Sequence, residues 1–334
     1  MATAIGLKII NEEKARKALK SLEPYTKTSL AIATNLSVAT CGNILKDLLA
    51  NGEVIEVELA ESTGGRPSRQ FIYNKDFSHV LAMYVRKERK DAIINYAVSN
   101  AVGEVVYEHY EEPTEINISK LDEIVKSITT EYSNIKSIAV GVPGVVIDGK
   151  VGICDFELLS NVDVRKYLSQ KYKIQVVVIN DVNCTALGYY FSGGFSQEES
   201  LAYIYYPVDG EPGAGIIIDG KVINGVSNFA GEVSYLPHYL FKDEIKNIGF
   251  DLAPFAQGVL YTIISINSVL NPKTIILSGF QLSDEIVYIL RKIIKDHLPK
   301  SHTPSILFQE DIHENYMIGL TKKALELLMH KAKL

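Results

Sequence analysis

The stretch Thr28-Ser-Leu-Ala-Ile-Ala-Thr-Asn35-Leu-Ser37-Val-Ala-Thr-Cys-Gly-Asn-Ile-Leu-Lys46-Asp-Leu-Leu49 predicts two short helices separated by a tight reversal of the chain. Leu30, Ala31 and Ala33 can bury one side of the first helix. Asn35 stands at the reversal, where a left-handed residue is often required and Asn is tolerated. Ser37 is a favourable N-cap for the second helix, whose apolar residues recur at helical spacing over 44–49. This pattern is typical of a helix-turn-helix.

A short β-hairpin is predicted directly after the two helices. The alternating run 54–59 and the segment 71–73 predict two strands, which are joined by a turn at Gly64-Gly-Arg66-Pro67. The hairpin carries Arg66 and Arg69 near its tip, where cations can contact phosphate or the minor groove. The turn, the cap and the basic tip together indicate a winged helix-turn-helix that binds DNA. A protein-docking module built from the same elements is the alternative.

The candidate DNA contacts fall into two groups. Small or polar side chains near the start of the second helix allow it to approach base edges in a major groove, and they are Ser37, Ala39, Thr40 and Asn43. The candidates for phosphate or minor-groove contacts are Thr28, Lys46, Arg66 and Arg69. An amphipathic basic helix over 11–22, capped by Asn11, is expected to support this unit as its first helix.

Composition describes an ordinary globular chain. The 334 residues predict two or three domains, and 47% hydrophobic with 22% charged residues suits soluble cores. No apolar run reaches the roughly 18 residues that span a bilayer, and the N-terminus lacks a signal peptide's apolar region. The three cysteines are far apart and form no Cys-x-x-Cys pair, which predicts a cytoplasmic protein without disulfides or a local zinc site.

The charge is distributed unevenly. Residues 1–74 hold 9 Lys and Arg against 8 Asp and Glu, whereas the remainder holds 25 against 32, so the net charges are +1 and −7. An acidic body argues against binding of a polyanion over the whole surface. Any contact with DNA is therefore expected to be local.

The remainder of the chain alternates between strand and helix patterns. Three strands in a row over 80–107 precede a helix at 118–132 and a strand at 137–142, and a similar series follows from 201 onwards, including helices at 284–297 and 319–331. This predicts an α/β fold with two similar lobes and a ligand cleft between them. The expected domains are a winged helix-turn-helix at 1–75, a first lobe at 76–185 and a second lobe at 186–334.

A series of short motifs follows this order: Gly64-Gly-Arg-Pro67, Gly141-Val-Pro-Gly144, Leu159-Ser-Asn161, Ile179-Asn-Asp-Val-Asn183, Gly213-Ala-Gly215 with Gly220, Gly231-Glu232, and Asn271-Pro-Lys-Thr-Ile-Ile-Leu-Ser-Gly279. Each motif is weak by itself. In this order and spacing they resemble the ROK family, which groups sugar-responsive repressors with sugar kinases on an actin/hexokinase-type fold. The resemblance covers essentially the whole chain and implies a repressor of the xylose or N-acetylglucosamine type.

The motifs of the predicted cleft suit a polyol. Asn180 and Asp181 close an apolar strand and place an amide and a carboxylate at its carboxyl end, where α/β clefts bind ligands. Gly144 is expected to let the backbone approach the ligand, and Asn161 and Glu232 are expected to add hydrogen bonds. The alternative for Asn180-Asp181 is an ordinary Asx turn at the end of a strand.

The chain departs from the kinases of this family at the first phosphate loop. In ROK kinases the carboxylate matching Asp181 accepts the sugar's proton, and a loop resembling Asp-x-Gly-x-Thr holds the nucleotide phosphates. Here Tyr84 stands in place of the Asp and Arg86 in place of the Gly. Tyr84 removes a carboxylate and Arg86 crowds the turn, so no catalytic residues and no kinase activity are expected.

A second departure concerns metal. Many members of the family carry Glu-x-Gly-His followed by a Cys-rich zinc loop, but here Glu232 is followed by Val-Ser-Tyr and no cysteine occurs after Cys184. A lone His238 is more often a hydrogen-bonded side chain than a ligand. We therefore expect no metal and no cofactor. The family's Glu shortly after Asn-Asp is Tyr189 here, which weakens the prediction of which sugar is bound.

The sequence predicts a DNA-binding transcriptional regulator, expected to be a repressor, that is controlled by a sugar or sugar phosphate in the cleft. The expected partners are a double-stranded DNA operator, the sugar effector, and a second copy in a homodimer or dimer of dimers, with no membrane contact. A sugar kinase with a DNA-binding extension, and a ligand-blind regulator released by a protein partner, are the alternatives.

Overall fold

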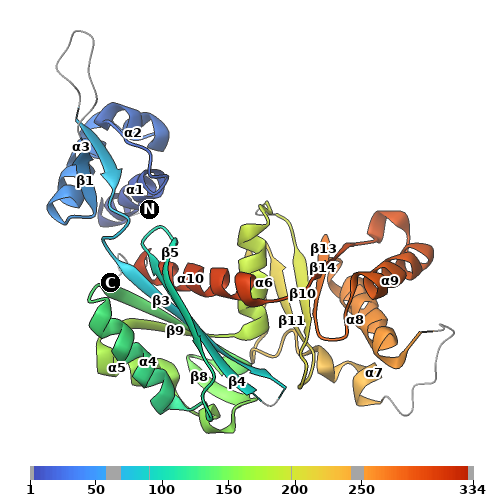
Figure 1. Cartoon of the computed structure of the whole chain (residues 1–334). Helices are drawn as coiled ribbons and strands as arrows, with labels where there is room; N and C mark the ends of the chain where they lie inside the picture. The colour runs from blue at the N-terminus through green and yellow to red at the C-terminus, as the bar shows by residue number, and fades with distance from the viewer. Residues whose placement is uncertain (1–3, 58–68, 90, 197, 242–251, 330–334) are drawn as a thin grey trace.

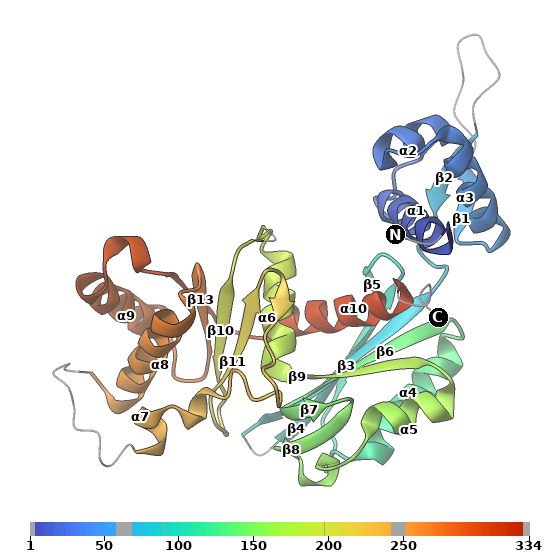
Figure 2. The same ribbon diagram turned by 180° about the vertical axis from the view of Figure 1, so that it is seen from behind.

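The computed structural model describes residues 4–57, 69–89, 91–196, 198–241 and 252–329. An N-terminal unit of helices and a small sheet stands above a body that contains two five-stranded sheets (Figure 1). In the view from behind, the first sheet and the second sheet lie on opposite sides of two central helices (Figure 2). The mixed α/β sheets that the sequence predicts are therefore confirmed.

The N-terminal unit (residues 4–57 and 69–74) contains α1 (Ala4–Leu19), α2 (Lys27–Thr34), α3 (Val38–Ala50), β1 (Val54–Val57) and β2 (Gln70–Tyr73). The two strands pair antiparallel, with Val54 opposite Tyr73. Fully buried leucines of the three helices, among them Leu19, Leu30 and Leu45, form the core with Phe71 of β2. Each helix is short, so burial of this shared core rather than helix propensity alone stabilises the unit.

The reversal between α2 and α3 has the conformation expected from its residues. Asn35 is left-handed, with φ 54° and ψ 42°, and the Ser37 side chain accepts a hydrogen bond from the Thr40 backbone N–H. One expectation for the first of these helices is wrong. Ala33 is exposed, and the next residue, Thr34, is buried instead. Thr34 can be buried because its Oγ1 donates a hydrogen bond to Leu30 O at 2.6 Å.

The first helix extends further towards the N-terminus than predicted. It begins by Ala4 rather than at an Asn11 cap, and it ends at Leu19 rather than at residue 22. Arg16 on this helix pairs with buried Glu53 at 2.7 Å, which fixes the helix against the start of β1. The predicted turn at 64–67 lies outside the described residues.

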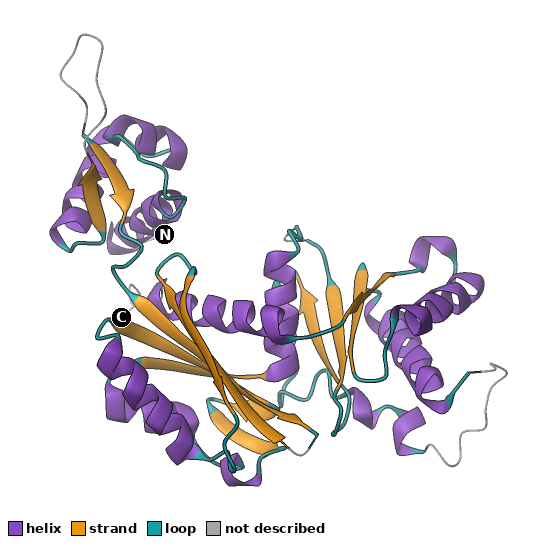
Figure 3. Ribbon diagram, viewed as in Figure 1, coloured by secondary structure: helices purple, strands orange, loops and turns teal. Residues whose placement is uncertain are grey.

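The first sheet has the strand order β5-β4-β3-β6-β9, with β3 central. Its elements and neighbours are β3 (His79–Glu88), β4 (Asp91–Asn100), β5 (Val105–Glu111), α4 (Ile118–Glu131), β6 (Ile135–Val142), the hairpin β7 (Gly144–Ile147) and β8 (Lys150–Cys154), η1 (Glu157–Leu159), α5 (Val164–Tyr172) and β9 (Gln175–Asn180). Helices α4 and α5 cover one face (Figure 3). Alternate residues of β3, such as Leu81 and Met83, pack against these helices.

The second sheet has the order β12-β11-β10-β13-β14. Its elements are β10 (Leu201–Tyr206), β11 (Gly213–Ile218), β12 (Lys221–Val222), η2 (Val233–Tyr235), α7 (Pro237–Leu240), α8 (Pro254–Leu270), β13 (Thr274–Gly279), α9 (Asp284–His297), η3 (Lys300–His302) and β14 (Ser305–Gln309). Helices α8 and α9 pack on one face of this sheet, as α4 and α5 do on the first. The parallel pair β10 and β13 forms its centre.

Helices α6 (Asp181–Ser192) and α10 (His313–Met329) lie between the two sheets (Figure 1). A Cβ atom at Gly188 would lie 1.7 Å from Asn315 O, and one at Gly319 would lie 2.1 Å from Cys184 O, so both glycines are required for this close crossing. Tyr316 and Leu320 of α10 share one core with residues of both sheets. The sequence predicts this helix only from residue 319, because the polar start at His313 hides its apolar face.

The N-terminal unit packs directly on the first sheet. Ala101 and Val102, in the turn between β4 and β5, belong to the core of the N-terminal unit, and Ala101 N donates to Lys75 O at 2.9 Å. Lys75 Nζ in turn contacts Glu104 at 2.9 Å. The strands of the first sheet therefore run from the N-terminal unit towards the space between the sheets. Among the helices described here, none is long and apolar enough to cross a membrane.

Candidate functional site

The candidate base-contacting residues share one surface of α3. Ser37, Ala39 and Asn43 are exposed and Thr40 is half-buried, whereas Cys41 and Leu45 on the opposite side are buried. The Ser37 and Thr40 hydroxyls lie 2.8 Å apart, so part of their hydrogen-bonding capacity is used locally. Helical periodicity thus separates a buried side from a surface of small and polar groups that a major groove could accept.

The candidate phosphate contacts surround this surface. Thr28 of α2 and Lys46 of α3 are exposed, and Lys46 forms no ion pair with any described residue. Arg69 is also exposed, and its Nε lies 3.2 Å from Glu56 Oε1. Arg66 lies outside the described residues.

Two exposed apolar side chains near this surface were missed by the sequence reasoning. Ile32 is 78% exposed on α2, and Val38 is 48% exposed at the start of α3. Apolar side chains in a major groove can contact the thymine methyl group. The sequence did contain a signal for one of them. Ile32 does not fall at the helical spacing shared by the buried residues of its helix.

Asn180 and Asp181 lie where β9 ends and α6 begins. Asn180 caps the helix, because its Oδ1 accepts from the Asn183 backbone N–H at 3.0 Å. Its Nδ2 donates to Gly144 O at 3.1 Å and to Asp181 Oδ1 at 2.9 Å. The Asn180 amide is therefore engaged by three interactions within the protein. One of them orients the Asp181 carboxylate, which is the group of this pair that remains available to a ligand.

Asp181 lies within electrostatic range of two other carboxylates, Asp155 and Glu232, and the three are called the carboxylate cluster below. Burial raises the pKa of Asp181 to about 7, a hydrogen bond from the Val182 backbone opposes the shift, and the charges of Asp155 and Glu232 add to it. Burial also raises the pKa of Asp155, which Lys87 partly offsets, and the pKa of Glu232. Poorly solvated carboxylates accept hydrogen bonds from hydroxyl groups, of which a polyol offers several.

Asp155 is a member of this cluster that the sequence reasoning missed. It directly follows the β7–β8 hairpin, and its backbone N–H donates to Pro143 O at 3.2 Å. A lone Asp after a hairpin carries no pattern in the sequence. Only the pairing of Gly144 with Cys154 brings it beside the end of β9.

The glycines of this region have a structural explanation. A Cβ atom at Gly144 would lie 2.4 Å from Ile153 O, and one at Gly231 would lie 1.9 Å from Ala214 O. Gly144 therefore allows β7 to pack on β8, which is a sufficient reason for glycine there. Gly231, next to Glu232, allows the chain to approach β11, with Ala214 N donating to Gly231 O at 2.8 Å.

Asn161 is placed differently from the other candidates. It is exposed and left-handed, with φ 66°, and its backbone N–H donates to Val151 O at 2.9 Å. No hydrogen bond between described residues joins its side chain to Asp181. The hydrogen bonds and charge effects thus bring together Gly144, Asn180, Asp181 and Glu232, but not Asn161.

Tyr84 and Arg86, near the end of β3, are engaged by other side chains of the protein. Tyr84 is fully buried, its ring stacks on Tyr316 with centroids 4.2 Å apart, and its hydroxyl lies 2.8 Å from His313 Nδ1. Burial raises the pKa of Tyr84, so the phenol stays neutral. Arg86, two residues further on, pairs with Glu88 and lies 3.6 Å from Asp311.

Within the described part of the chain, no three His, Cys, Asp or Glu side chains gather as a metal site. His238 Nε2 lies 3.2 Å from Thr262 Oγ1, and the imidazole packs against the rings of Tyr239 and Tyr261. Burial lowers the pKa of His238. The contacts of this histidine are therefore those of a packed, hydrogen-bonded side chain.

Comparison with known proteins identifies a family domain. Residues 92–244 match the model of the ROK family. The chain is 29% identical over 254 residues to a xylose repressor of Caldicellulosiruptor bescii, covering 73% of this chain and 62% of the relative. It is 24% identical over 241 residues to the Escherichia coli DNA-binding transcriptional dual regulator NagC, covering 69% and 58%. The chain thus spans less than two thirds of these relatives' length.

Solved structures share the fold. A ROK family transcriptional regulator, described as a homologue of the E. coli MLC protein, matches with a TM-score of 0.71 at 16% identity and covers 98% of both chains. A ROK family glucokinase from Streptomyces griseus, solved with glucose and AMPPNP, matches with a TM-score of 0.56 at 16% identity and covers 75% of this chain and all of its own. The actin/hexokinase-like ROK fold is therefore confirmed for the body.

Proposed function

Because the chain carries a ROK family domain over residues 92–244, we propose that it is a sugar-responsive, DNA-binding transcriptional regulator that acts as a repressor. Residues 1–75 are a winged helix-turn-helix in this proposal, and 76–185 and 186–334 are the two lobes. The names of the xylose repressor and of NagC support this function. A homodimer presents two N-terminal units to the two halves of an operator.

The exposed side of α3 supports the DNA-binding part of the proposal. It combines small side chains at the helix start with Lys46, which no described carboxylate neutralises. Thr28 and Arg69 lie on neighbouring elements and would contact phosphates, together with Arg66. On a chain with a net charge of −6, such a local surface is where a polyanion can bind.

The carboxylate cluster is the observation that carries the effector part. Asp181 is held at the start of α6 by Asn180, close to Asp155 and Glu232, and these groups can accept hydrogen bonds from adjacent hydroxyls of a sugar. Gly144, which accepts a hydrogen bond from Asn180, and Asn161, which lies outside these hydrogen bonds, remain proposed ligand contacts. Ligand binding acts on DNA affinity only if it favours one of two conformations.

A sugar kinase is the second candidate, because the glucokinase shares the fold of the body. Tyr84 argues against it, since its stacked and buried ring occupies the place where the kinases' first phosphate loop would have a carboxylate. We therefore propose that the chain has no phosphoryl-transfer activity and needs no cofactor.

The experiment that tests this function measures operator recovery and sugar binding on the same full-length protein. Genomic fragments retained by the purified protein are sequenced, and the protein's affinity for them is measured with and without common pentoses and hexoses.

We expect Lys46→Ala to weaken retention of DNA. Lys292→Ala, at an exposed lysine on α9, should leave retention unchanged. Asp181→Asn should abolish the sugar response while DNA binding persists. Turnover of ATP and a sugar, lost in Asp181→Asn, would contradict the proposal.

A further inference from the structure

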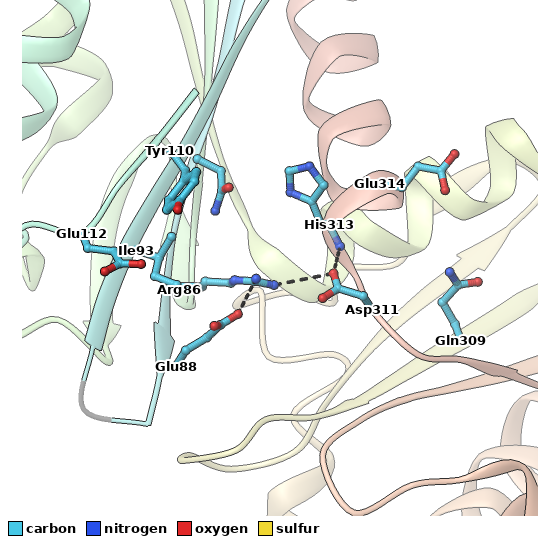
Figure 4. A pocket seen from close by; sticks show the side chains of 10 residues that line it. Arg86, Glu88, Ile93, Tyr110, Glu112, Gln309, Asp311, His313 and Glu314 are labelled. Atoms are coloured by element: carbon cyan, nitrogen blue, oxygen red, sulfur yellow. Dashed lines mark hydrogen bonds and ion pairs between the residues drawn. The ribbon is translucent and has the colours of Figure 1, made fainter. Parts of the chain in front are cut away.

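A pocket lies between the first sheet and the start of α10 (Figure 4). Its walls come from β3, β4 and β5 on one side and from the segment joining β14 to α10 on the other. Its volume of about 580 Å³ is in the range of small-molecule sites. None of Gly144, Asn180, Asp181 and Glu232 lines it, so it is separate from the carboxylate cluster around Asp181.

The strand register places three side chains in a row beneath this pocket. Tyr84 on β3 is opposite Asn95 on β4, and Asn95 is opposite Tyr110 on β5. Directly opposed residues point to the same face of a sheet. Tyr84 is held by its contact with His313, so Asn95 and Tyr110 are the members of the row that line the pocket.

The pocket contains two buried donors that lack acceptors. Asn95 is 9% exposed, and neither its Nδ2 nor the Nε of Arg86 has a hydrogen-bond partner among the described residues. A buried donor without an acceptor is unfavourable, and native proteins normally supply one. Both atoms therefore need an oxygen acceptor that the chain does not provide.

The charge of the lining selects against anions. The carboxylates Glu88 and Asp311 pair with Arg86, whereas Glu112 and Glu314 are exposed and form no ion pair with a described residue. Figure 4 shows these two glutamates on opposite sides of the pocket. A phosphate or carboxylate would be repelled by this excess of negative charge, and a cation would be attracted.

The exposed ring of Tyr110 adds a flat wall. This side chain is 58% exposed, and the face of an aromatic ring attracts ammonium groups and packs on apolar faces of ring-shaped ligands. The pocket thus offers donors for neutral oxygens at its base and carboxylates with an aromatic face nearer the solvent.

We propose that this pocket binds a small hydroxylated amine, such as an amino sugar. Hydroxyl oxygens of the ligand accept hydrogen bonds from Asn95 Nδ2 and Arg86 Nε, and its ammonium group is attracted by Glu112 and Glu314. This site is additional to the proposed sugar site at Asp181 and does not depend on it. Binding here contacts β4, whose far end packs into the N-terminal unit through Ala101.

The test is calorimetric titration of the full-length protein with glucosamine, below the pKa of its amine, and with glucose as the uncharged counterpart. Asn95→Leu keeps the size of the side chain but removes the donor, so glucosamine affinity should fall at least about tenfold. The melting temperature of the free variant should stay equal or rise, because an unpartnered buried donor is lost. Glucosamine affinity should not change in Lys292→Ala, an exposed position on α9 that lines neither site.

A double variant, Glu112→Gln with Glu314→Gln, changes only exposed groups and tests the charge. It should weaken glucosamine binding several-fold and leave any glucose binding unchanged. No measurable glucosamine binding, or binding insensitive to both Asn95→Leu and the double variant, would overturn the proposal. If Asn95→Leu fails to fold, the double variant decides. Loss of the glucose response in Asp181→Asn concerns the proposed sugar site only, so the two outcomes remain distinguishable.

Discussion

The first and second sheets share a plan but differ where each faces the central helices. In the first sheet, Tyr84 and Arg86 near the end of β3 fill that place with a stacked ring and a guanidinium. In the second sheet, strand β11 begins with Gly213-Ala-Gly215. A Cβ atom at Gly215 would lie 2.5 Å from Val182 O in α6. At the first sheet, large side chains of β3 fill the space next to the central helices. At the second sheet, the backbone of α6 itself lies against β11. The two sheets therefore pack against the central helices by different means.

Tyr84→Asp introduces a carboxylate at a fully buried position of β3, and it should have the largest effect. It removes the stack on Tyr316 and buries a carboxylate, so we expect a loss of about 4 kcal/mol in the free energy of unfolding. Chemical denaturation measures this change. Tyr84→Phe keeps the stack and should lose only about 1 kcal/mol, through the contact with His313. Phosphorylation of a sugar by the Asp variant, and not by the wild type, would support the role proposed for Tyr84.

Gly319→Ala tests the central helices that both sheets share. The new methyl group would meet the Cys184 carbonyl, so we expect a loss of about 3 kcal/mol in unfolding free energy. Gly258→Ala in α8 is the matched control, because its Cβ would have only ordinary contacts with Tyr239. There, Ala should stabilise the helix by up to about 1 kcal/mol. Equal effects at both positions would mean that the crossing of α6 and α10 is not tightly packed.

The carboxylate cluster predicts a pH dependence that Asp181→Asn should remove. The pKa of Asp181 rises from 3.8 to about 7 on folding, so the folded protein binds this proton more tightly than the unfolded chain does. The resulting stability is fully present below about pH 4 and is lost as the pH rises to about 7. Melting temperatures from pH 4 to 8 should show this loss in the wild type and in the control Asp148→Asn. A wild-type profile parallel to that of Asp181→Asn contradicts the assignment.

The smallest effect is expected in the N-terminal unit, far from both sheets' central faces. Ser37→Ala removes the acceptor for the Thr40 N–H at the start of α3, which should lower stability by about 1 kcal/mol. Thermal unfolding of the full-length protein measures it. If the unit melts separately from the body, the contact of Ala101 with its core is too weak to join them.

The sequence determined the local structure of the N-terminal unit and much of the body. The left-handed Asn35 and the Ser37 cap follow from side chains that hydrogen-bond within a few residues of themselves. The strand ending at Asn180 and the helix ending at residue 297 likewise follow from local periodicity and caps.

Tertiary structure alone decided which distant groups meet. Asp155 joins Asp181 because β7 pairs with β8, and Asn95 lies between Tyr84 and Tyr110 because three strands share one register. The start of α10 at His313 depends on packing against β3 and α6, since its first turn has no apolar pattern of its own. Side-chain pairing across strands and helices depends on distances in space, and a single sequence records only distances along the chain.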